Sequence, residues 1–479
     1  MSSSYPIQID ATVHDPALQK AVYTATGRLM DMRRNAVALV PQFEELRNHA
    51  NAVKRHTIGH LDHYLELVER NVEAHGGEVV FAQDSTEVAD FILTLAKQKG
   101  AKLFVKSKSM TTEEIHLNSR LEAHQLEAVE TDLGEYILQL ADERPYHIIA
   151  PALHYTRHDV ARIFEKKLGR TETEPSDQAM IARAVLRQKF LDADIGITGA
   201  NFVIADSGAV VVVENEGNAR LTHSAPKIHI AIAGIEKIIP RAQDLAVFLA
   251  LLGRSATGQA MSVYTSFVSG PRRTGEVDGP DEFYLILLDN GRTKVLADEA
   301  KRQSLYCIRC GACLNHCPVY RKIGGHNYPW IYSGPIGAIL TPQFHGIDHD
   351  PWLPFASSLC GACAEVCPVK IDIPRVLLEL RRDVIESKTA AGANKLERMV
   401  FRMWAWAMKR PHMYERLGKM AAIGAPRGDA KTGWIKDLPG FLAPGPVAGW
   451  LQERDLPRPA AHSFRELWRE RQKKKGPAT

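Results

Sequence analysis

Cysteine is absent from most of this chain of 479 residues, because all seven cysteines lie between positions 307 and 367. Two common nucleotide-binding patterns are also absent, namely Gly-x-Gly-x-x-Gly and Gly-x4-Gly-Lys-Ser/Thr. Their absence argues against an ordinary dinucleotide-binding domain and against a P-loop. No flavin fingerprint and no complete catalytic constellation of acid and base is evident either, so it stays open whether the chain is itself an enzyme.

Long apolar runs are also missing. The stretch at 245–252 is among the longest and is far shorter than the ~20 residues that a membrane-spanning helix needs. Residues 1–10 are polar and predict no signal peptide. The net charge of +4 predicts no nucleic-acid surface, and the basic stretch at 471–475 is interpreted as solvated chain. We therefore expect a cytoplasmic protein in a reducing compartment that preserves thiols.

What the chain does have is a duplicated cysteine motif. The shared pattern is Cys-Gly-Ala-Cys-x3-Cys-Pro-Val, and a fourth cysteine precedes only the first copy. The copies comprise Cys307, Cys310, Cys313 and Cys317, then Ser357, Cys360, Cys363 and Cys367. This spacing is typical of bacterial ferredoxins with two iron–sulfur clusters, in which the fourth cysteine of each motif ligates the other cluster.

The crossed rule assigns the ligands of two 4Fe-4S clusters. We expect the first cluster to be bound by Cys307, Cys310, Cys313 and Cys367. The second would be bound by Cys317, Cys360 and Cys363, and it lacks one cysteine. Ser357 occupies the missing place, so it is either an oxygen ligand or marks a 3Fe-4S cluster or an open iron site.

Zinc sites and disulfides are the alternative interpretations of the cysteines. Zinc sites usually combine two separated pairs of ligands around one tetrahedral ion, which matches this spacing less well. A disulfide framework matches poorly, because seven is an odd number and nothing else marks secretion.

Hydrophobic patterning predicts the organisation of the chain. Residues 1–70 predict a helical segment, with helical periodicity continuing to about 75, and residues 71–295 predict an α/β domain with a mainly parallel sheet. Residues 296–390 predict a mostly helical, ferredoxin-like two-cluster domain, and residues 391–479 a helical segment and tail. We expect helices at 86–98, 113–124 and 374–385, a hairpin through 206–208, and strands at 78–82, 102–106, 147–150, 202–205, 209–213, 229–233 and 284–288.

Two segments near the cysteines carry unusual composition. The insertion at 318–359 is rich in glycine, proline and aromatics, and we expect it to cover a cluster edge or to form a docking surface, with Trp330 among its contacts. The segment at 399–410 contains Phe401, Trp404 and Trp406. It predicts either a core helix or a contact with a partner or a membrane surface.

A second, weaker motif runs from Gly196 to Arg220. Small residues lie at its turns, and Thr198, Ser207, Gly208 and Arg220 are candidate cofactor-binding residues. Backbone N–H groups at such turns can bind an anionic ligand, although tight turns alone also explain these residues.

Taken in order, several segments make the sequence similar to a known family. The residues are Val105–Thr112, Gly196–Pro240, the first cysteine motif with Ile323-Gly-Gly-His326, and Ser463–Trp468. Together they resemble lactate utilization protein B, an iron–sulfur subunit of a bacterial L-lactate oxidation system. The resemblance covers nearly the whole chain. It implies a lactate-utilization domain with a fold similar to sugar-phosphate isomerases and CoA-transferases, joined to the two-cluster domain.

Three functional hypotheses are open. The first is an electron-transfer subunit of an NAD-independent system that oxidises lactate to pyruvate. Its expected partners are companion subunits that include another iron–sulfur protein, and its expected acceptor is quinone-linked. At most a peripheral contact with a membrane is expected. The second is a redox-sensing or scaffold protein whose clusters take no part in turnover. A third, in which this chain alone is the dehydrogenase, has little support in its residues.

Overall fold

The computed structural model describes residues 8–390, 395–424, 433–435 and 454–475. The chain divides into two compact units, Met1–Ile385 and Glu386–Thr479. Among the described residues, no helix combines the length and the apolar character needed to cross a membrane.

The first unit begins with a series of helices, which confirms the helical pattern expected up to about residue 75. The series comprises α1 (Gln8–His14), α2 (Pro16–Ala38), α3 (Phe43–Gly59) and α4 (Leu61–Ala74). Asp15 caps α2, because its carboxylate accepts hydrogen bonds from the backbone N–H groups of Ala17 and Leu18. Pro16 occupies the first turn, where no backbone donor is needed.

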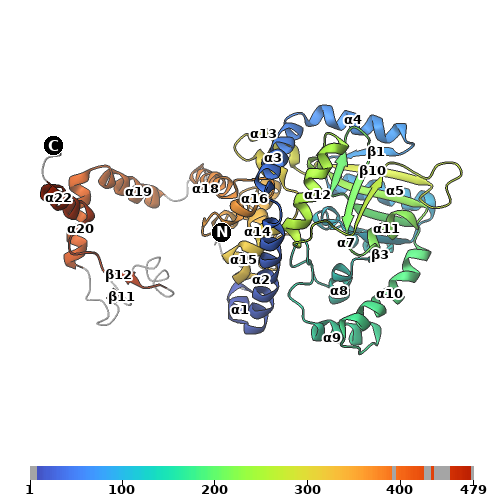
Figure 1. Cartoon of the computed structure of the whole chain (residues 1–479), viewed down its shortest axis with the longest axis horizontal. Coiled ribbons are helices and arrows are strands. Elements are labelled where there is room, and N and C mark those ends of the chain that lie inside the picture. The colour runs from blue at the N-terminus through green and yellow to red at the C-terminus, as the bar shows by residue number, and fades with distance from the viewer. Residues whose placement is uncertain (1–7, 391–394, 425–432, 436–453, 476–479) are drawn as a thin grey trace. The chain divides into compact units, whose positions relative to one another are not determined.

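A six-stranded sheet follows, and every strand pair in it is parallel, which confirms the mainly parallel sheet expected from the sequence (Figure 1). Its spatial order is β1-β10-β7-β4-β2-β3. The strands are β1 (Glu78–Ala82), β2 (Leu103–Ser107), β3 (Glu127–Glu130), β4 (Ile195–Gly199), β7 (Ile228–Gly234) and β10 (Glu282–Leu288). Every residue of β7 is buried, as expected for a central parallel strand covered on both faces.

Different elements cover the two faces of this sheet. Val88 and Ile92 of α5 (Ser85–Lys99) and Leu121 of α7 (Leu117–Ala123) pack on one face. On the other face lie α4 and a smaller sheet of order β8-β5-β6-β9. Its strands are β5 (Phe202–Ile204), β6 (Val210–Glu214), β8 (Ile238–Ile239) and β9 (Tyr264–Val268). β5 and β6 are antiparallel, which confirms the predicted hairpin.

Further helices complete this part of the unit. They are α6 (Met110–Glu114), α8 (Leu133–Ala141), α9 (Arg157–Leu168), α10 (Pro175–Asp192), α11 (Asn218–Ser224), the short η1 (Ile235–Lys237), α12 (Ala242–Ala256) and α13 (Arg292–Ala297). The single helix predicted at 113–124 is instead the pair α6 and α7, because His116 between them has a positive φ of 52°.

The strand predictions were partly wrong. Residues 147–150 form no strand but an irregular segment that packs against the first cysteine motif, where His147 Nε2 lies 3.1 Å from Asn315 Oδ1. Strands β3, β4, β8 and β9 were not among those predicted. β3, β8 and β9 are short or partly exposed segments with little local signal, and their place in a sheet depends on distant partners.

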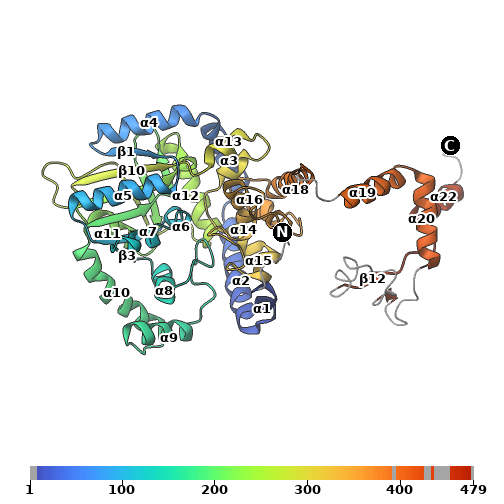
Figure 2. The ribbon, with the colours of Figure 1, turned by 180° about the vertical axis from the view of Figure 1, so that it is seen from behind.

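The cysteine region consists of short helices that pack beside the N-terminal helices (Figures 1 and 2). It comprises η2 (Arg302–Tyr306), α14 (Ala312–His316), α15 (Pro318–Ile323), α16 (Gly334–His345), η3 (Leu353–Phe355), α17 (Ala362–Val366) and α18 (Ile373–Ala390). Val22, Phe43 and Ala50 of α2 and α3 share one apolar core with Cys310 and Cys367. The helical N-terminus and the cysteine region therefore fold as one body.

The second unit is smaller and mainly helical. Its described elements are α19 (Lys395–Met408), α20 (Pro411–Gly424), β11 (Trp434–Ile435), β12 (Leu456–Pro457) and α22 (Phe464–Lys475). The guanidinium of Arg469 in α22 pairs with Glu415 of α20 at 2.6 Å. The basic stretch at 471–475 lies in α22 and is exposed where its side chains are described.

Candidate metal centre

The first cysteine motif forms a tight loop followed by one helical turn. Arg309 and Gly311 have positive φ values of 60° and 71°, which fold the chain back before α14. A Cβ atom on Gly311 would also lie 3.0 Å from the ring of His147. Both the positive φ and this close approach therefore favour glycine at this position. The backbone N–H of Arg309 donates to Cys307 Sγ at 3.4 Å, and that of Tyr320 donates to Cys317 Sγ at 3.4 Å.

The second motif repeats the geometry of this loop. Leu359 and Gly361 have positive φ values of 54° and 85°, and α17 corresponds to α14. Cys367 Sγ accepts from the N–H of Ile371 at 3.4 Å. Where the first loop has Arg309 N–H donating to a sulfur, the second has Leu359 N–H donating to Ser357 Oγ at 3.1 Å. The Ser357 hydroxyl therefore occupies the local position of the Cys307 thiol.

Four of the sulfurs come together from both motifs. Cys307, Cys310, Cys313 and Cys367 line one small cavity, whose other walls include Ile148, Ile336 and Ile373. Burial raises the pKa of the Cys310 thiol, and the nearby sulfur of Cys367 raises it further. The fourth cysteine of the second motif thus lies with the first three of the first motif.

The remaining three sulfurs form a second set. Burial raises the pKa of the Cys317 thiol, with a smaller effect from Cys360. Burial raises the pKa of Cys363 to about 12, and Cys317 is the next largest cause. Cys360 is exposed, whereas Cys317 and Cys363 are buried, so one sulfur of this set reaches the surface.

These donors match an iron–sulfur cluster better than the alternatives. All seven cysteines are free thiols, so the disulfide interpretation is wrong. The first cavity is mainly apolar and has four cysteine sulfurs around it, and backbone N–H groups donate to two of these sulfurs. Iron–sulfur clusters use this ligand set and these surrounding contacts.

Helices α2 and α3 hold the second motif through hydrogen bonds to its backbone. Arg47 Nε donates to the carbonyl of Cys367 at 2.9 Å, and its NH2 group donates to Glu365 at 2.7 Å. Arg33 NH2 donates to the carbonyl of Val366 at 3.1 Å. These contacts place two permanent positive charges beside sulfurs that become negative on metal binding, which favours the ligated state.

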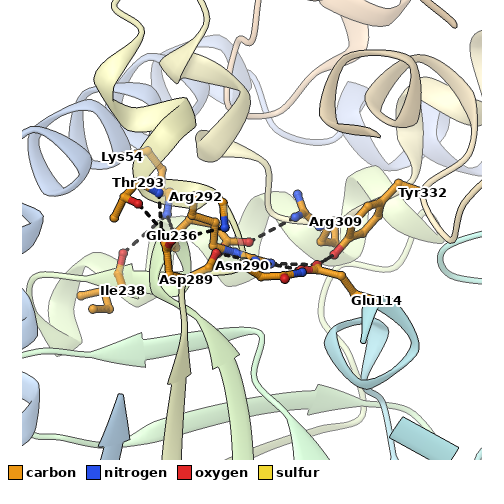
Figure 3. A network of polar contacts seen from close by, with 11 residues as sticks. Lys54, Glu114, Glu236, Ile238, Asp289, Asn290, Arg292, Thr293, Arg309 and Tyr332 are labelled. Atoms are coloured by element: carbon orange, nitrogen blue, oxygen red, sulfur yellow. Dashed lines mark hydrogen bonds and ion pairs between the residues drawn. The ribbon is translucent and has the colours of Figure 1, made fainter. Parts of the chain in front are cut away.

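A buried network of charges links the first motif to the large sheet (Figure 3). Arg309 NH2 donates to Glu236 Oε1 at 3.1 Å, and Arg292 Nε donates to Glu236 Oε2 at 2.5 Å. Arg292 also binds Glu114 through two hydrogen bonds of 2.8 Å, and the Tyr332 hydroxyl donates to Glu114 at 2.5 Å. Sequence reasoning missed this network, although Arg309 is visible inside the Cys-Ile-Arg-Cys motif.

The network shifts the pKa values of its members. Burial alone would raise the pKa of Glu236, but Arg292 and then Arg309 lower it to about 2. Burial lowers the pKa of Lys54 to about 7, against the opposing effect of Glu236. The Lys54 ammonium donates to the backbone carbonyls of Glu236 and Ile238. The carboxylate of Glu236 therefore stays ionised at neutral pH and fixes the side chain of Arg309.

The candidate cofactor residues of the second motif do not meet at one place. Thr198 is fully buried, and its hydroxyl lies 2.8 Å from His229 Nε2. Ser207 and Gly208 form the turn of the β5–β6 hairpin, where Gly208 packs against α4. Arg220 is exposed on α11. A cavity does open next to Thr198, but it is lined by Gly199, Ala200 and Asn201 instead.

The aromatic insertion belongs to the core. The side chains of Tyr328, Trp330 and Tyr332 are at most 6% exposed, so the suggestion that they form a docking surface is wrong. They pack inward because the insertion folds into α15 and α16 around the first motif, and Ile336 of α16 lines the first sulfur cavity. The insertion therefore covers the first site.

The aromatic segment at 399–410 falls in α19. Phe401, Trp404 and Trp406 are each at least half exposed, so within the second unit α19 does not bury these side chains as a core helix would. The expected alternative, a contact with a partner or a membrane surface, stays a prediction.

Comparisons with known proteins agree with this arrangement. The LUD domain model matches residues 65–288, the 4Fe-4S dicluster domain model matches 303–371, and the model "Lactate utilisation protein B, C-terminal" matches 380–473. The chain is 42% identical over 477 residues to the lactate utilization protein B of Bacillus velezensis, covering 99% of this chain and 98% of that protein. It is 44% identical over 461 residues to that of Bacillus licheniformis, covering 96% and 95%.

A solved structure of a DUF162 family protein from Deinococcus radiodurans is also similar, with a TM-score of 0.27 and 11% identity. The matched region covers 48% of this chain and 98% of that protein.

Proposed function

Because the chain belongs to the lactate utilization protein B family, we propose that it is the iron–sulfur electron-transfer subunit of an NAD-independent system that oxidises L-lactate to pyruvate. The observation that carries this proposal is the division of the seven cysteines into two adjacent sets, each drawing on both motifs. Two neighbouring sets of thiolates suit the transfer of single electrons better than a structural role, for which one metal site is enough.

We propose crossed ligation for the two sets. Cys307, Cys310, Cys313 and Cys367 would hold one 4Fe-4S cluster, and Cys317, Cys360 and Cys363 would hold the other. When bound, such clusters accept and release one electron at a time. Ser357 is the candidate fourth ligand of the second set, since its hydroxyl matches the position of Cys307 and would offer oxygen in place of sulfur.

The residues around the two sets suggest a direction for electron flow. Buried side chains enclose the first set, including Ile336 of the insertion. Cys360 in the second set is exposed, so a partner can approach its sulfur closely. We propose that electrons enter at the first set and leave at the second, toward companion subunits that include another iron–sulfur protein and, in the end, a quinone-linked acceptor.

The test is anaerobic purification of the full chain, followed by iron and sulfide analysis and by electron paramagnetic resonance (EPR). Lactate should reduce both clusters when the companion lactate-utilization proteins are present, and should fail to do so with this chain alone. Clusters that stay oxidised with lactate and the complete set of companions would refute the electron-transfer role.

A second candidate is a redox-sensing or scaffold protein. It is favoured by one observation: the cysteines share an apolar core with α2 and α3, so the clusters would also hold the fold together. Controlled oxidation separates the two candidates. A sensor should change its binding of partners when its clusters are oxidised, whereas an electron carrier should return to its starting state after each cycle of reduction and oxidation.

A further inference from the structure

A cavity of about 520 Å³ lies at the carboxyl end of the large parallel sheet. Its walls include the loop after β2, at Lys108–Thr111, and the loop after β4, at Gly199–Asn201. Strands β2 and β4 are neighbours in the large sheet. Along the chain, the next strand of this sheet after β2 is β3, on one side of the pair, and the next after β4 is β7, on the other side of the pair. The cavity therefore lies where the strand order reverses, which is the place where open α/β sheets bind ligands.

Two buried cations line the end of this cavity nearest the first cysteine set. Arg309 and Lys237 are each 8% exposed. Arg309 also lines the sulfur cavity, so it forms part of the wall between the two spaces. Its guanidinium lies 4.6 Å from the centre of the Tyr332 ring, and its NH2 group is taken by Glu236.

These cations have donors to spare. The NH1 group of Arg309 is buried and has no hydrogen-bond partner within the described part of the chain. Lys237 likewise makes no hydrogen bond or ion pair with any residue that the structure describes. A buried guanidinium nitrogen without a partner is costly, so Arg309 NH1 points to an anionic ligand, and the Lys237 ammonium on the same cavity wall is a second donor for it.

The wall of the cavity also carries acidic groups. Asp132, Glu135 and Glu216 line it, and the cation there, Lys108, is already paired with Asp132. Burial, and next the charge of Asp132, raise the pKa of Glu135, whose Oε2 atom is buried without a partner among the described residues. A ligand with a second negative group, such as a dicarboxylate or a nucleotide, would be repelled here. A single carboxylate with a neutral hydroxyl or oxo group would not.

We propose that this cavity binds a short 2-hydroxy or 2-oxo monocarboxylic acid, with its carboxylate held by Lys237 and Arg309. The choice of a 2-hydroxy acid rests on the proposed function, whereas the need for one anionic group follows from the charges of the cavity. The apolar parts of the wall, formed by Ile148, Leu252 and Ala256 among others, suit a short aliphatic chain.

Isothermal titration calorimetry on the anaerobically purified full chain tests this proposal. L-lactate and pyruvate should bind, and propionate, which lacks the 2-oxygen, should bind more weakly. Inorganic phosphate and flavin mononucleotide are the comparison ligands. Saturable binding of the flavin without any binding of the acids would overturn the proposal in favour of a cofactor site, and the absence of binding by either acid would overturn it outright.

Variants connect the binding to the cavity. Lys237→Gln should weaken lactate binding at least about tenfold, since it removes a charge-assisted hydrogen bond, and Lys237→Arg should restore part of it. Lys166→Gln on the exposed face of α9 is the matched control and should change nothing. Binding that survives Lys237→Gln unchanged would refute the proposal.

Ala152→Phe provides an independent variant, because it fills the cavity from a loop without altering any charge. It should weaken lactate binding while iron content and EPR signals stay as in the wild type. Unchanged binding in this variant would also count against the cavity. If lactate still reduces the clusters in the complete system but does not bind this chain alone, the present inference fails and the electron-transfer function stands.

Discussion

Replacing Glu236 with glutamine should destabilise the first unit by about 3 kcal/mol. Glutamine keeps the shape of the side chain but removes the charge that pairs with Arg292 at 2.5 Å and with Arg309 at 3.1 Å. The pKa of Glu236 falls from its ordinary 4.5 to about 2. Since one unit of pKa is worth about 1.4 kcal/mol, the ionised carboxyl is favoured in the folded state by about 3 kcal/mol. Loss of one partner of a buried ion pair costs about 3–5 kcal/mol, which agrees.

The assay is urea unfolding of the anaerobically prepared protein, followed by circular dichroism. We would measure at pH 9, because the pKa of Lys54 is about 7 and its side chain is then a neutral amine in the wild type. Removal of the nearby Glu236 charge can only lower that pKa further, so Lys54 is neutral in both proteins. The difference between them then reports the contacts of Glu236 alone.

Glu165→Gln on the exposed face of α9 is the matched control, and it should change stability by less than about 0.5 kcal/mol. A loss in Glu236→Gln no greater than that of the control would refute the reasoning. A second readout follows from Arg309, which Glu236 holds beside Cys307. The EPR signal of the first cluster should change in Glu236→Gln, and that of the second should not.

Three other changes test the cysteine sites and the buried lysine. Cys317→Ala should remove the EPR signal of the cluster bound by Cys360 and Cys363, and an effect confined to the other cluster would disprove crossed ligation. Ser357→Cys should slow the conversion of the second cluster to a three-iron form in air, because thiolate binds iron more strongly than oxygen does; equal rates would mean that Ser357 is not at the open corner. Lys54→Met should flatten the dependence of stability on pH. The pKa of Lys54 is lowered from 10.5 to about 7 on folding, so the free energy of unfolding of the wild type rises between pH 7 and pH 10.5 by up to about 1.4 kcal/mol per pH unit. An unchanged slope in urea titrations of the variant would contradict this.

The sequence by itself determined the features that depend on short-range chemistry. The cysteine spacing indicates the loops, because ligands within seven residues of each other need only local geometry and one helical turn. The parallel sheet follows from apolar runs such as Ile228–Gly234 alternating with helical patterns. The hairpin at 206–208 follows in the same way from its turn residues.

Only the tertiary structure decided where these parts meet. His147–Ala150 has the composition of a strand, yet it stays irregular because its neighbours are the first cysteine loop and Asn315, far along the chain. Trp330 carries no local sign of burial, and it is buried because the insertion folds inward. Glu236 and Arg309 are separated by 73 positions, and long-range pairing of charges leaves no periodicity in a sequence. The cavity with Arg309 and Lys237 in its wall exists only because the large sheet ends next to the first cysteine set.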